Sequence, residues 1–191
     1  METIVKSLIG IFTIIDGKIN LLMDNNDLLT VICNDNVEDE NKKYIENNLD
    51  IEDLNLKQCY TFSEKVDEKL LISILYVDII NYRNIKSNKF TLKPIDTLDE
   101  SIYTEKLKEY LKRELVFNST IKRIYPEEFV LPEIQKIYED LLNKKYDRRN
   151  FRKRLIKLDV IEDLNKISEN KKGRPAKLYR FKDITEDKIL F

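Results

Sequence analysis

Apolar and polar residues follow two different patterns along this chain of 191 residues, and the pattern changes near its middle. In the first half, short runs rich in β-branched and other apolar residues predict strands. These strands are expected at residues 8–15, 18–23, 54–62, 70–80 and 90–94. Asp16 and Gly17 separate the first two runs and favour a two-residue hairpin turn. Only residues 39–49 show a weak helical pattern, so this half predicts a mostly β domain within an α+β protein.

The second half shows helical spacing instead. Residues 101–117 carry apolar side chains on one face among many Lys and Glu residues, which predicts an amphipathic helix. A second helix is predicted over residues 134–142, where apolar residues recur at helical intervals behind Pro132. Proline is favoured at the first helical position, and we expect Pro132 there.

A third helix is predicted after Asp147, whose side chain suits the N-cap position. Phe151 and Leu155 are among the apolar residues on one of its faces. Short strands are expected at residues 160–161 and 178–181, with a basic connection between them. Helix, turn, helix and a strand pair is the order of a winged helix-turn-helix domain.

These patterns predict three parts along the chain. The N-terminal sheet domain covers residues 1–98, a linker helix covers 99–120, and the winged helix domain covers 121–191. Two roles are open for the linker helix. It packs on one or both domains, or it serves dimerisation.

The formal net charge of −1 conceals two opposed parts. Residues 144–182 contain fifteen basic and five acidic residues, a local net charge of +10, so the rest of the chain carries −11. A positive segment at the predicted recognition helix and wing can neutralise phosphates and release counterions. The division of charge therefore favours a nucleic-acid partner for the C-terminal domain.

The composition excludes several classes of chemistry. The chain has no His, which removes His-based triads and imidazole metal sites. Cys33 and Cys59 lack a metal-binding spacing, and we expect both to be reduced and to lie in or near strands. No apolar run is long enough for a membrane span and the N-terminus does not resemble a signal peptide, so we expect a cytoplasmic protein without a membrane partner.

The residues expected to contact DNA lie in two groups. The recognition helix supplies Arg148, Arg149, Asn150, Arg152 and Lys153, and the wing supplies Lys171, Lys172, Arg174 and Lys177. Arginine can bind guanine through two hydrogen bonds, and Asn150 either reads adenine or faces the domain interior. The wing residues would contact phosphate or enter the minor groove. The alternative for both groups is a solvated basic surface with no partner.

Four blocks of the C-terminal segment resemble a known family. They are residues 126–135, Tyr138-Glu139, residues 147–154 and residues 173–181, in this order. These blocks look like the winged helix domain of Nudix-related transcriptional regulators (NrtR-like). Residues 56–62 and 71–76 resemble the same family less strongly. One departure is Val130, where family members commonly have a Thr that caps the following helix.

The resemblance also implies a Nudix box, and this chain departs from it. Aligning residues 58–62 with the family places Lys43 at the box Arg and Tyr44 at the adjacent Glu. Asn47 and Asn48 fall at the Glu-Glu pair, Asp50 at the late Gly, and Thr30 to Asp35 at the preceding loop. Residues 25–60 contain no Gly and no Arg. Because such glutamates hold divalent cations against a diphosphate, we expect no catalysis and no cofactor. The acidic residues 38–40 are a remnant metal site or, as we favour, a solvated helix start.

The resulting hypothesis is a homodimeric transcription regulator that binds a double-stranded DNA operator. The degenerate Nudix-like domain would serve as sensor for an effector such as ADP-ribose, as implied by the resemblance, or as a dimerisation platform. Two alternatives are open. One is a metal-dependent Nudix pyrophosphatase with an atypical site, and the other is a regulator that has lost its effector.

Overall fold

The computed structural model describes residues 2–51, 54–125, 128–168, 175–183 and 186–191. The chain forms two compact units, one of residues up to 15 with 19–110 and one of residues 16–18 with 111–191. The division falls inside one helix, α2 (Ile102–Leu115), between Tyr110 and Leu111. No helix in the described ranges is long and apolar enough to cross a membrane.

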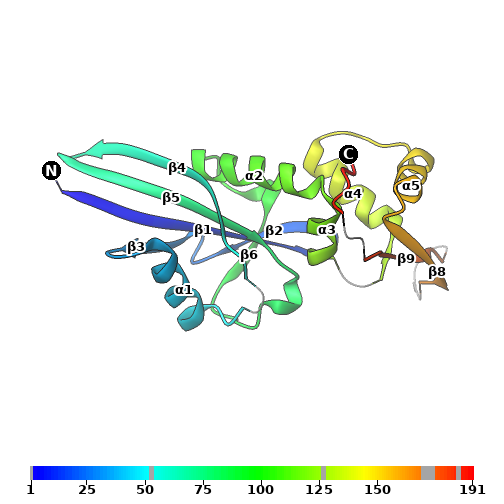
Figure 1. Ribbon diagram of the computed structural model, residues 1–191, viewed down its shortest axis with the longest axis horizontal. Helices are drawn as coiled ribbons and strands as arrows, with labels where there is room; N and C mark the ends of the chain where they lie inside the picture. Colours follow the sequence, from blue (N-terminus) through cyan, green and yellow to red (C-terminus); the bar gives the residue numbers. More distant parts are fainter. Residues whose placement is uncertain (1, 52–53, 126–127, 169–174, 184–185) are drawn as a thin grey trace. The chain divides into compact units, whose positions relative to one another are not determined.

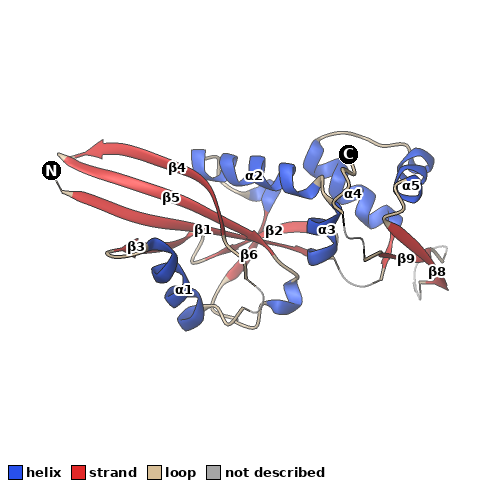
Figure 2. Cartoon of the chain, in the orientation of Figure 1, coloured by secondary structure: helices blue, strands red, loops and turns tan. Residues whose placement is uncertain are grey.

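Unit 1 is built on a mixed six-stranded sheet (Figure 2). Its strands are β1 (Thr3–Ile15), β2 (Lys18–Met23), β3 (Leu29–Cys33), β4 (Lys57–Val66), β5 (Lys69–Ile79) and β6 (Thr91–Pro94). The strand order is β4-β5-β1-β2-β6, and β3 pairs with β1. Strands β1 and β5 are parallel, whereas β1–β3, β2–β6 and β4–β5 are antiparallel. The predicted α+β class with a mixed sheet is therefore confirmed.

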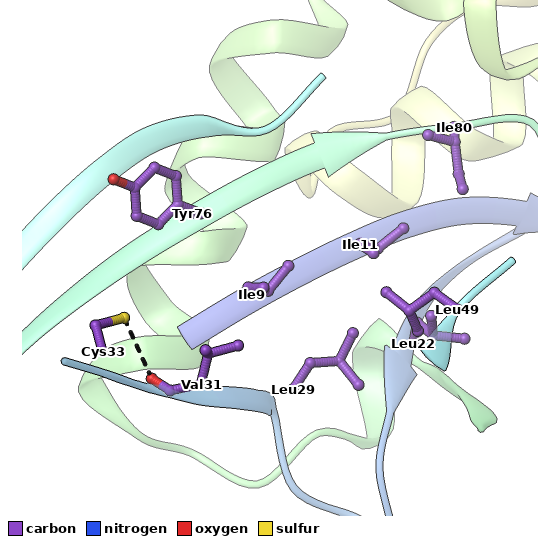
Figure 3. Packing of buried hydrophobic residues seen from close by; sticks show 9 residues of the cluster. All are labelled: Ile9, Ile11, Leu22, Leu29, Val31, Cys33, Leu49, Tyr76 and Ile80. Carbon is purple, nitrogen blue, oxygen red and sulfur yellow. Dashed lines mark hydrogen bonds between the residues drawn. The ribbon is translucent and has the colours of Figure 1, made fainter. Parts of the chain in front are cut away.

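Helices cover both faces of this sheet. Helix α1 (Val37–Asn48) lies against one face and the first part of α2 against the other (Figure 1). On the α1 face, Ile9 and Ile11 of β1 belong to a buried cluster with Tyr76 and Ile80, seen in Figure 3. Two short 3-10 helices, Tyr82–Asn84 and Ile95–Thr97, complete the unit.

Gly10 sets how closely α2 approaches β1. A Cβ atom at this position would lie 2.6 Å from Leu107 Cδ2, which is closer than real Cβ contacts. Leu107 is fully buried, so it has little room to move aside. The absence of a side chain at Gly10 therefore lets the helix pack on the strand. Where α2 starts, Ser101 and Thr104 exchange backbone-to-hydroxyl hydrogen bonds of 3.0 and 3.1 Å.

Unit 2 contains the helices and strands of a winged helix. They are α3 (Asn118–Ile124), β7 (Phe129–Val130), α4 (Leu131–Leu142), α5 (Arg148–Lys157), β8 (Ile161–Ile167) and β9 (Lys177–Phe181). The three strands form a sheet of order β7-β9-β8. The apolar periodicity of the predicted helices is confirmed, because Ile134, Ile137, Tyr138 and Leu141 of α4 are buried.

The sequence patterns missed β3, α3 and β7. Residues 30–33 were expected in the loop before the Nudix helix, but residues 29–33 form strand β3. This segment pairs with β1, and its side chains alternate between buried and exposed positions. Pro132 occupies the second helical position of α4, since Leu131 is the first. Val130 is the N-cap and makes no side-chain cap hydrogen bond, as its aliphatic side chain requires.

The contact between Gly10 and Leu107 can be tested by double mutation. We expect Gly10→Ala to destabilise unit 1 by about 1–3 kcal/mol, because the new methyl group overpacks the interface. Leu107→Ala alone should cost about 2–5 kcal/mol through the cavity it leaves. In the double variant the cavity left by Leu107→Ala can hold the methyl group that Gly10→Ala introduces. The loss of unfolding free energy of the double variant, measured by urea unfolding, should therefore be smaller than the sum of the two single losses. Strict additivity would contradict the proposed contact.

Candidate nucleic-acid interface

The start of α5 is fixed by its N-cap. Asp147 has an extended backbone, and its Oδ1 accepts a hydrogen bond of 2.9 Å from the backbone N–H of Asn150. This carboxylate satisfies an otherwise free helix N–H and interacts favourably with the helix dipole. The predicted cap is therefore confirmed, and it fixes the first turn of the helix that carries Arg148 and its basic neighbours.

The turn between α4 and α5 is closed by Glu139. Its carboxylate accepts hydrogen bonds from Gln135 Nε2 at 2.8 Å, the Tyr146 backbone N–H at 2.9 Å and Lys145 Nζ at 3.0 Å. These donors lower the pKa of Glu139 to about 2, with the Gln135 amide contributing most. Gln135 Nε2 also donates to the Tyr146 carbonyl at 2.8 Å. The left-handed backbone of Asn143, with φ of 48°, lets the chain leave α4 at this point.

Helix α5 presents a strongly basic face. Phe151 and Leu155 are its two buried residues. Arg148, Arg149, Asn150, Arg152 and Lys153 are all exposed. Within the described part of the chain, Arg148, Arg149 and Lys153 have no acidic partner. Arg152 lies near enough to Asp163 to help lower the pKa of that carboxyl group.

The exposure of Asn150 decides between its two sequence-based alternatives. Its side chain faces solvent beside the arginines and does not face the domain interior. Its backbone N–H is used by the Asp147 cap, and no described group takes its side-chain amide. The residue is therefore placed where an exposed amide could reach a base edge.

The predicted wing is described only in part. Lys171, Lys172 and Arg174 lie outside the described residues. Lys177 is the first residue of β9, and its Nζ forms an ion pair of 2.7 Å with Asp163 Oδ2 on β8. This bond and a hydrogen bond from the Asn165 backbone N–H lower the pKa of Asp163. Lys177 therefore has to exchange a carboxylate for a phosphate if it contacts DNA.

Several other cations of the basic segment are also neutralised within the fold. Lys182 pairs with Asp159 at 2.6 Å, Lys166 pairs with Glu128 at 2.7 Å, and Arg180 pairs with Glu162. Arg154 points to the C-terminal segment, where its Nε donates to the Leu190 carbonyl. Among the described residues, the uncompensated positive charge of this segment is thus concentrated on α5.

Unit 1 contains two open cavities, of about 610 and 460 Å³. The larger is lined by Asp24, Asp27, Asp99 and Lys93, among others, and Lys93 pairs with Asp99 at 3.3 Å. The smaller lies beside α1 and is lined in part by Glu38, Glu46, Asn41 and Tyr76. Asn41 is buried, and neither of its amide atoms has a hydrogen-bond partner among the described residues. Both cavities have more carboxylates than ammonium groups along their walls.

Helix α1 carries the residues that the sequence alignment places at the Nudix box. The sequence alignment places Asn47 and Asn48 at the two final carboxylate positions, and Asn48 Nδ2 donates to the Tyr44 carbonyl at 2.8 Å. Lys43 pairs with Glu40 at 3.5 Å. The described residues contain no group of three or more Asp, Glu or Cys side chains that could hold a metal ion.

Comparison with known proteins agrees with this geometry. Residues 123–181 match the family model of the NrtR DNA-binding winged helix domain. This match lies within the C-terminal unit. The chain is also 42% identical over 60 residues to the ADPR responsive transcriptional repressor NtrR of Acinetobacter baylyi. That alignment covers 30% of this chain and only 23% of the repressor, so the chain matches about a quarter of that relative.

Solved structures extend the likeness to the whole fold. Shewanella oneidensis NrtR complexed with a 27mer DNA has a TM-score of 0.67 and 19% identity, with 93% of each chain covered. A MutT/nudix family protein from Enterococcus faecalis has a TM-score of 0.59 and 14% identity, with 95% of this chain and 87% of that chain covered. The expected combination of a Nudix-like sheet domain and an NrtR-type winged helix is confirmed as the fold of this chain.

The C-terminal segment lies within the predicted domain of residues 121–191, but its pattern predicted neither a strand nor a helix. Residues 186–191 pack against α4 and α5 through Leu190 and Phe191. The only sequence sign was the apolar triplet Ile189-Leu190-Phe191 after a polar stretch. Three residues are too few to define a periodicity.

The low pKa of Glu139 predicts how the domain responds to acid. Its carboxylate stabilises the folded state fully above its ordinary pKa of 4.5, and this contribution is lost as the pH falls towards about 2. Glu139→Gln should therefore melt at a lower temperature than the wild type near neutral pH, and the difference should shrink over that acidic range. Circular dichroism melts at a series of pH values measure this. Asp140→Asn, an exposed carboxyl on the same helix, is the control, and a difference that persists at about pH 2 would contradict the assignment.

Proposed function

We propose that this protein is a sequence-specific DNA-binding transcription regulator. The observation that carries the proposal is the exposed face of α5, where Arg148, Arg149 and Lys153 lack acidic partners in the described part of the chain. Unpaired cations on a recognition helix attract the phosphate backbone and bring the helix into the major groove. Support comes from the NrtR winged helix match over the same residues.

The side chains on α5 suit different contacts. Arg148, Arg149 and Arg152 can each bind guanine through two hydrogen bonds, and Asn150 can do the same with adenine. Lys153 is suited to phosphate as a point charge. We assign Lys171, Lys172, Arg174 and Lys177 of the wing to phosphate or the minor groove.

We further propose that the regulator acts as a homodimer on an operator with two half-sites. Two recognition helices about one turn of DNA apart double the contacts and set the spacing of the operator. The division of labour would be a Nudix-like platform at 1–98, a linker helix at 99–120 and a DNA-binding domain at 121–191. We also propose that the protein acts in the cytoplasm.

The role proposed for the Nudix-like domain is effector sensing, dimerisation or both. The Acinetobacter relative is described as ADPR responsive, which supports ADP-ribose or a related nucleotide or sugar as the effector. A ligand that binds one arrangement of the dimer better than another would shift the population able to span both half-sites. The carboxylates lining the two cavities repel a diphosphate that arrives without a cation.

Residues of α1 support the proposed absence of hydrolase activity. A diphosphate-cleaving Nudix site needs several carboxylates around divalent cations. Here Asn47 and Asn48 stand at two of those positions, and Glu40 is engaged with Lys43.

The DNA-binding proposal predicts a specific effect of removing two arginines. Arg148→Ala with Arg152→Ala should weaken binding to the upstream region of the protein's own operon by at least about tenfold, because base and phosphate contacts are both lost. The dependence of affinity on salt should also decrease, by about one unit of slope for each phosphate contact removed. Fluorescence anisotropy over about 50–200 mM salt measures both quantities.

A second pair of cations provides the matched control. Lys42→Ala with Lys43→Ala removes the same charge from exposed positions on α1. This variant should bind like the wild type, which separates a specific contact from an effect of net charge. Unchanged affinity after the double arginine substitution would show that α5 does not read the DNA.

The proposed loss of hydrolysis predicts no turnover of ADP-ribose with Mg²⁺ or Mn²⁺. Chromatographic detection of AMP release is the measurement. Turnover that disappears in a Glu40→Gln variant would support the metal-dependent pyrophosphatase instead. Calorimetry with ADP-ribose and nucleotide sugars then separates a sensor, which binds, from a regulator without an effector, which does not.

A further inference from the structure

The segment Glu186–Phe191 lies beyond the region matched by the winged helix family, which ends at residue 181. It nevertheless contacts three helices of unit 2. Its Leu190 side chain is fully buried, and its Phe191 ring packs among aromatic side chains of α4 and α5. We call this segment the C-terminal strap.

The strap completes an aromatic cluster around the recognition helix. The Phe191 ring stacks on Phe151 of α5, with ring centroids 4.9 Å apart and planes within 9°. It also lies 4.6 Å from the ring of Tyr138 and 5.0 Å from the ring of Tyr146. Aromatic rings at such distances attract one another beyond simple burial. Phe191 therefore gives Phe151 a stacked partner, in addition to the tilted rings of Tyr138 at 6.2 Å and Tyr146 at 5.8 Å.

Arg154 differs from the other arginines of α5 because it binds the strap. Its Nε donates to the Leu190 carbonyl, and its guanidinium group lies over the Phe191 ring at 5.5 Å. Lys188 Nζ donates to the carbonyl of Leu158, the C-cap of α5, at 2.7 Å. The strap thus holds the helix through a side chain in its last turn and through a carbonyl at its end.

The other edge of the strap is attached to the segment between α2 and α3. The Leu190 backbone N–H donates to the Val116 carbonyl at 2.7 Å, and Ile189 forms a β-bridge with Phe117. Asp187 Oδ1 accepts a hydrogen bond of 3.1 Å from the backbone N–H of Ser119, in the first turn of α3. The strap is therefore fixed on both sides, with α5 as one of its two attachments.

Helix α5 needs such a support. It has ten residues, too few for a stable helix in isolation, and it buries only Phe151 and Leu155. With only these two buried side chains as anchors, a short helix can rotate about the line that joins them. A third attachment at its C-terminal end removes this freedom and holds the basic face in one orientation.

We propose that the C-terminal strap positions α5 for DNA binding, with Phe191 and Arg154 as the positioning residues. Neither residue contacts DNA in this arrangement. The proposal rests on the proposed function, in which α5 is the recognition helix. It adds that residues outside the family's winged helix region determine how well this helix reads its operator.

The test compares Phe191→Ala with Ile189→Ala in the full chain. Ile189 is 59% exposed and contributes its backbone to the strap, so its variant is the matched control. Phe191→Ala should weaken operator binding by about tenfold, comparable to the loss of one base contact, and Ile189→Ala should leave affinity unchanged. The salt dependence of binding should stay that of the wild type, because no phosphate contact is removed. Phe191→Tyr, which keeps the ring, should restore affinity.

Two results would overturn the proposal. One is an affinity of Phe191→Ala within about twofold of the wild type, which is smaller than the effect of losing one base contact. The other is a reduced salt slope, which would make the strap a DNA contact and not a support. Arg154→Gln should reproduce the loss of affinity with the slope unchanged.

Hydrogen exchange separates this proposal from the proposed function. In Phe191→Ala, the amides of α5 should exchange at least about tenfold faster while those of β1 and β5 keep their wild-type rates. This result requires no DNA. If wild-type protein fails to bind DNA but α5 loosens as described, the strap is correct and the function is wrong. If α5 exchanges at the wild-type rate, the strap is wrong whatever the DNA result.

Discussion

The winged helix unit depends on the burial of one side chain, Tyr138 of α4. Its ring is completely buried and lies 6.2 Å from the ring of Phe151 and 4.6 Å from that of Phe191. Its hydroxyl donates to the carbonyl of Leu115, the last residue of α2, at 2.6 Å. Burial raises the pKa of this phenol, so it stays neutral and remains a donor. A single residue therefore joins the end of α2, the recognition helix and the C-terminal strap.

The buried side chains hold α5 on its inner face, so its outer face can carry charged residues. Ion pairs within the domain determine how much of the positive charge of residues 144–182 is free to act on a phosphate. Lys177, Lys182 and Lys166 face carboxylates on neighbouring elements. Exposed pairs of this kind contribute little to stability, but they reduce the field that a phosphate meets. The arginines of α5 gain in relative importance because their neighbours are neutralised. Composition alone therefore overstated the free charge of the described part of this segment.

The sequence was informative wherever a local rule determines the structure. The Asp147 cap, the hairpin at Asp16-Gly17 and the buried spacing of α4 each depend on neighbouring residues. Strand β7 has two residues and α3 has seven, so both are shorter than the window of about 11–18 residues in which apolar periodicity is read. The exposed positions of the cations on α5 were predictable to the same extent. Arg148 and its neighbours follow from a helix with one apolar face, whereas the ion pair of Lys177 and the attachment of Arg154 to Leu190 connect residues that only the tertiary fold brings together.

The acidity of the rest of the chain acts on both proposed partners. The net charge of −11 outside residues 144–182 repels the DNA phosphates, which favours contact through the basic segment. The same sign disfavours a diphosphate in the cavities near Asp24 and Glu38, where a phosphate would need a cation or a displaced carboxylate. An effector that binds there without metal must therefore supply hydrogen-bond donors or positive charge of its own. The amide of buried Asn41 sets a similar demand, since neither its oxygen nor its nitrogen has a hydrogen-bond partner in the ranges that the structure describes.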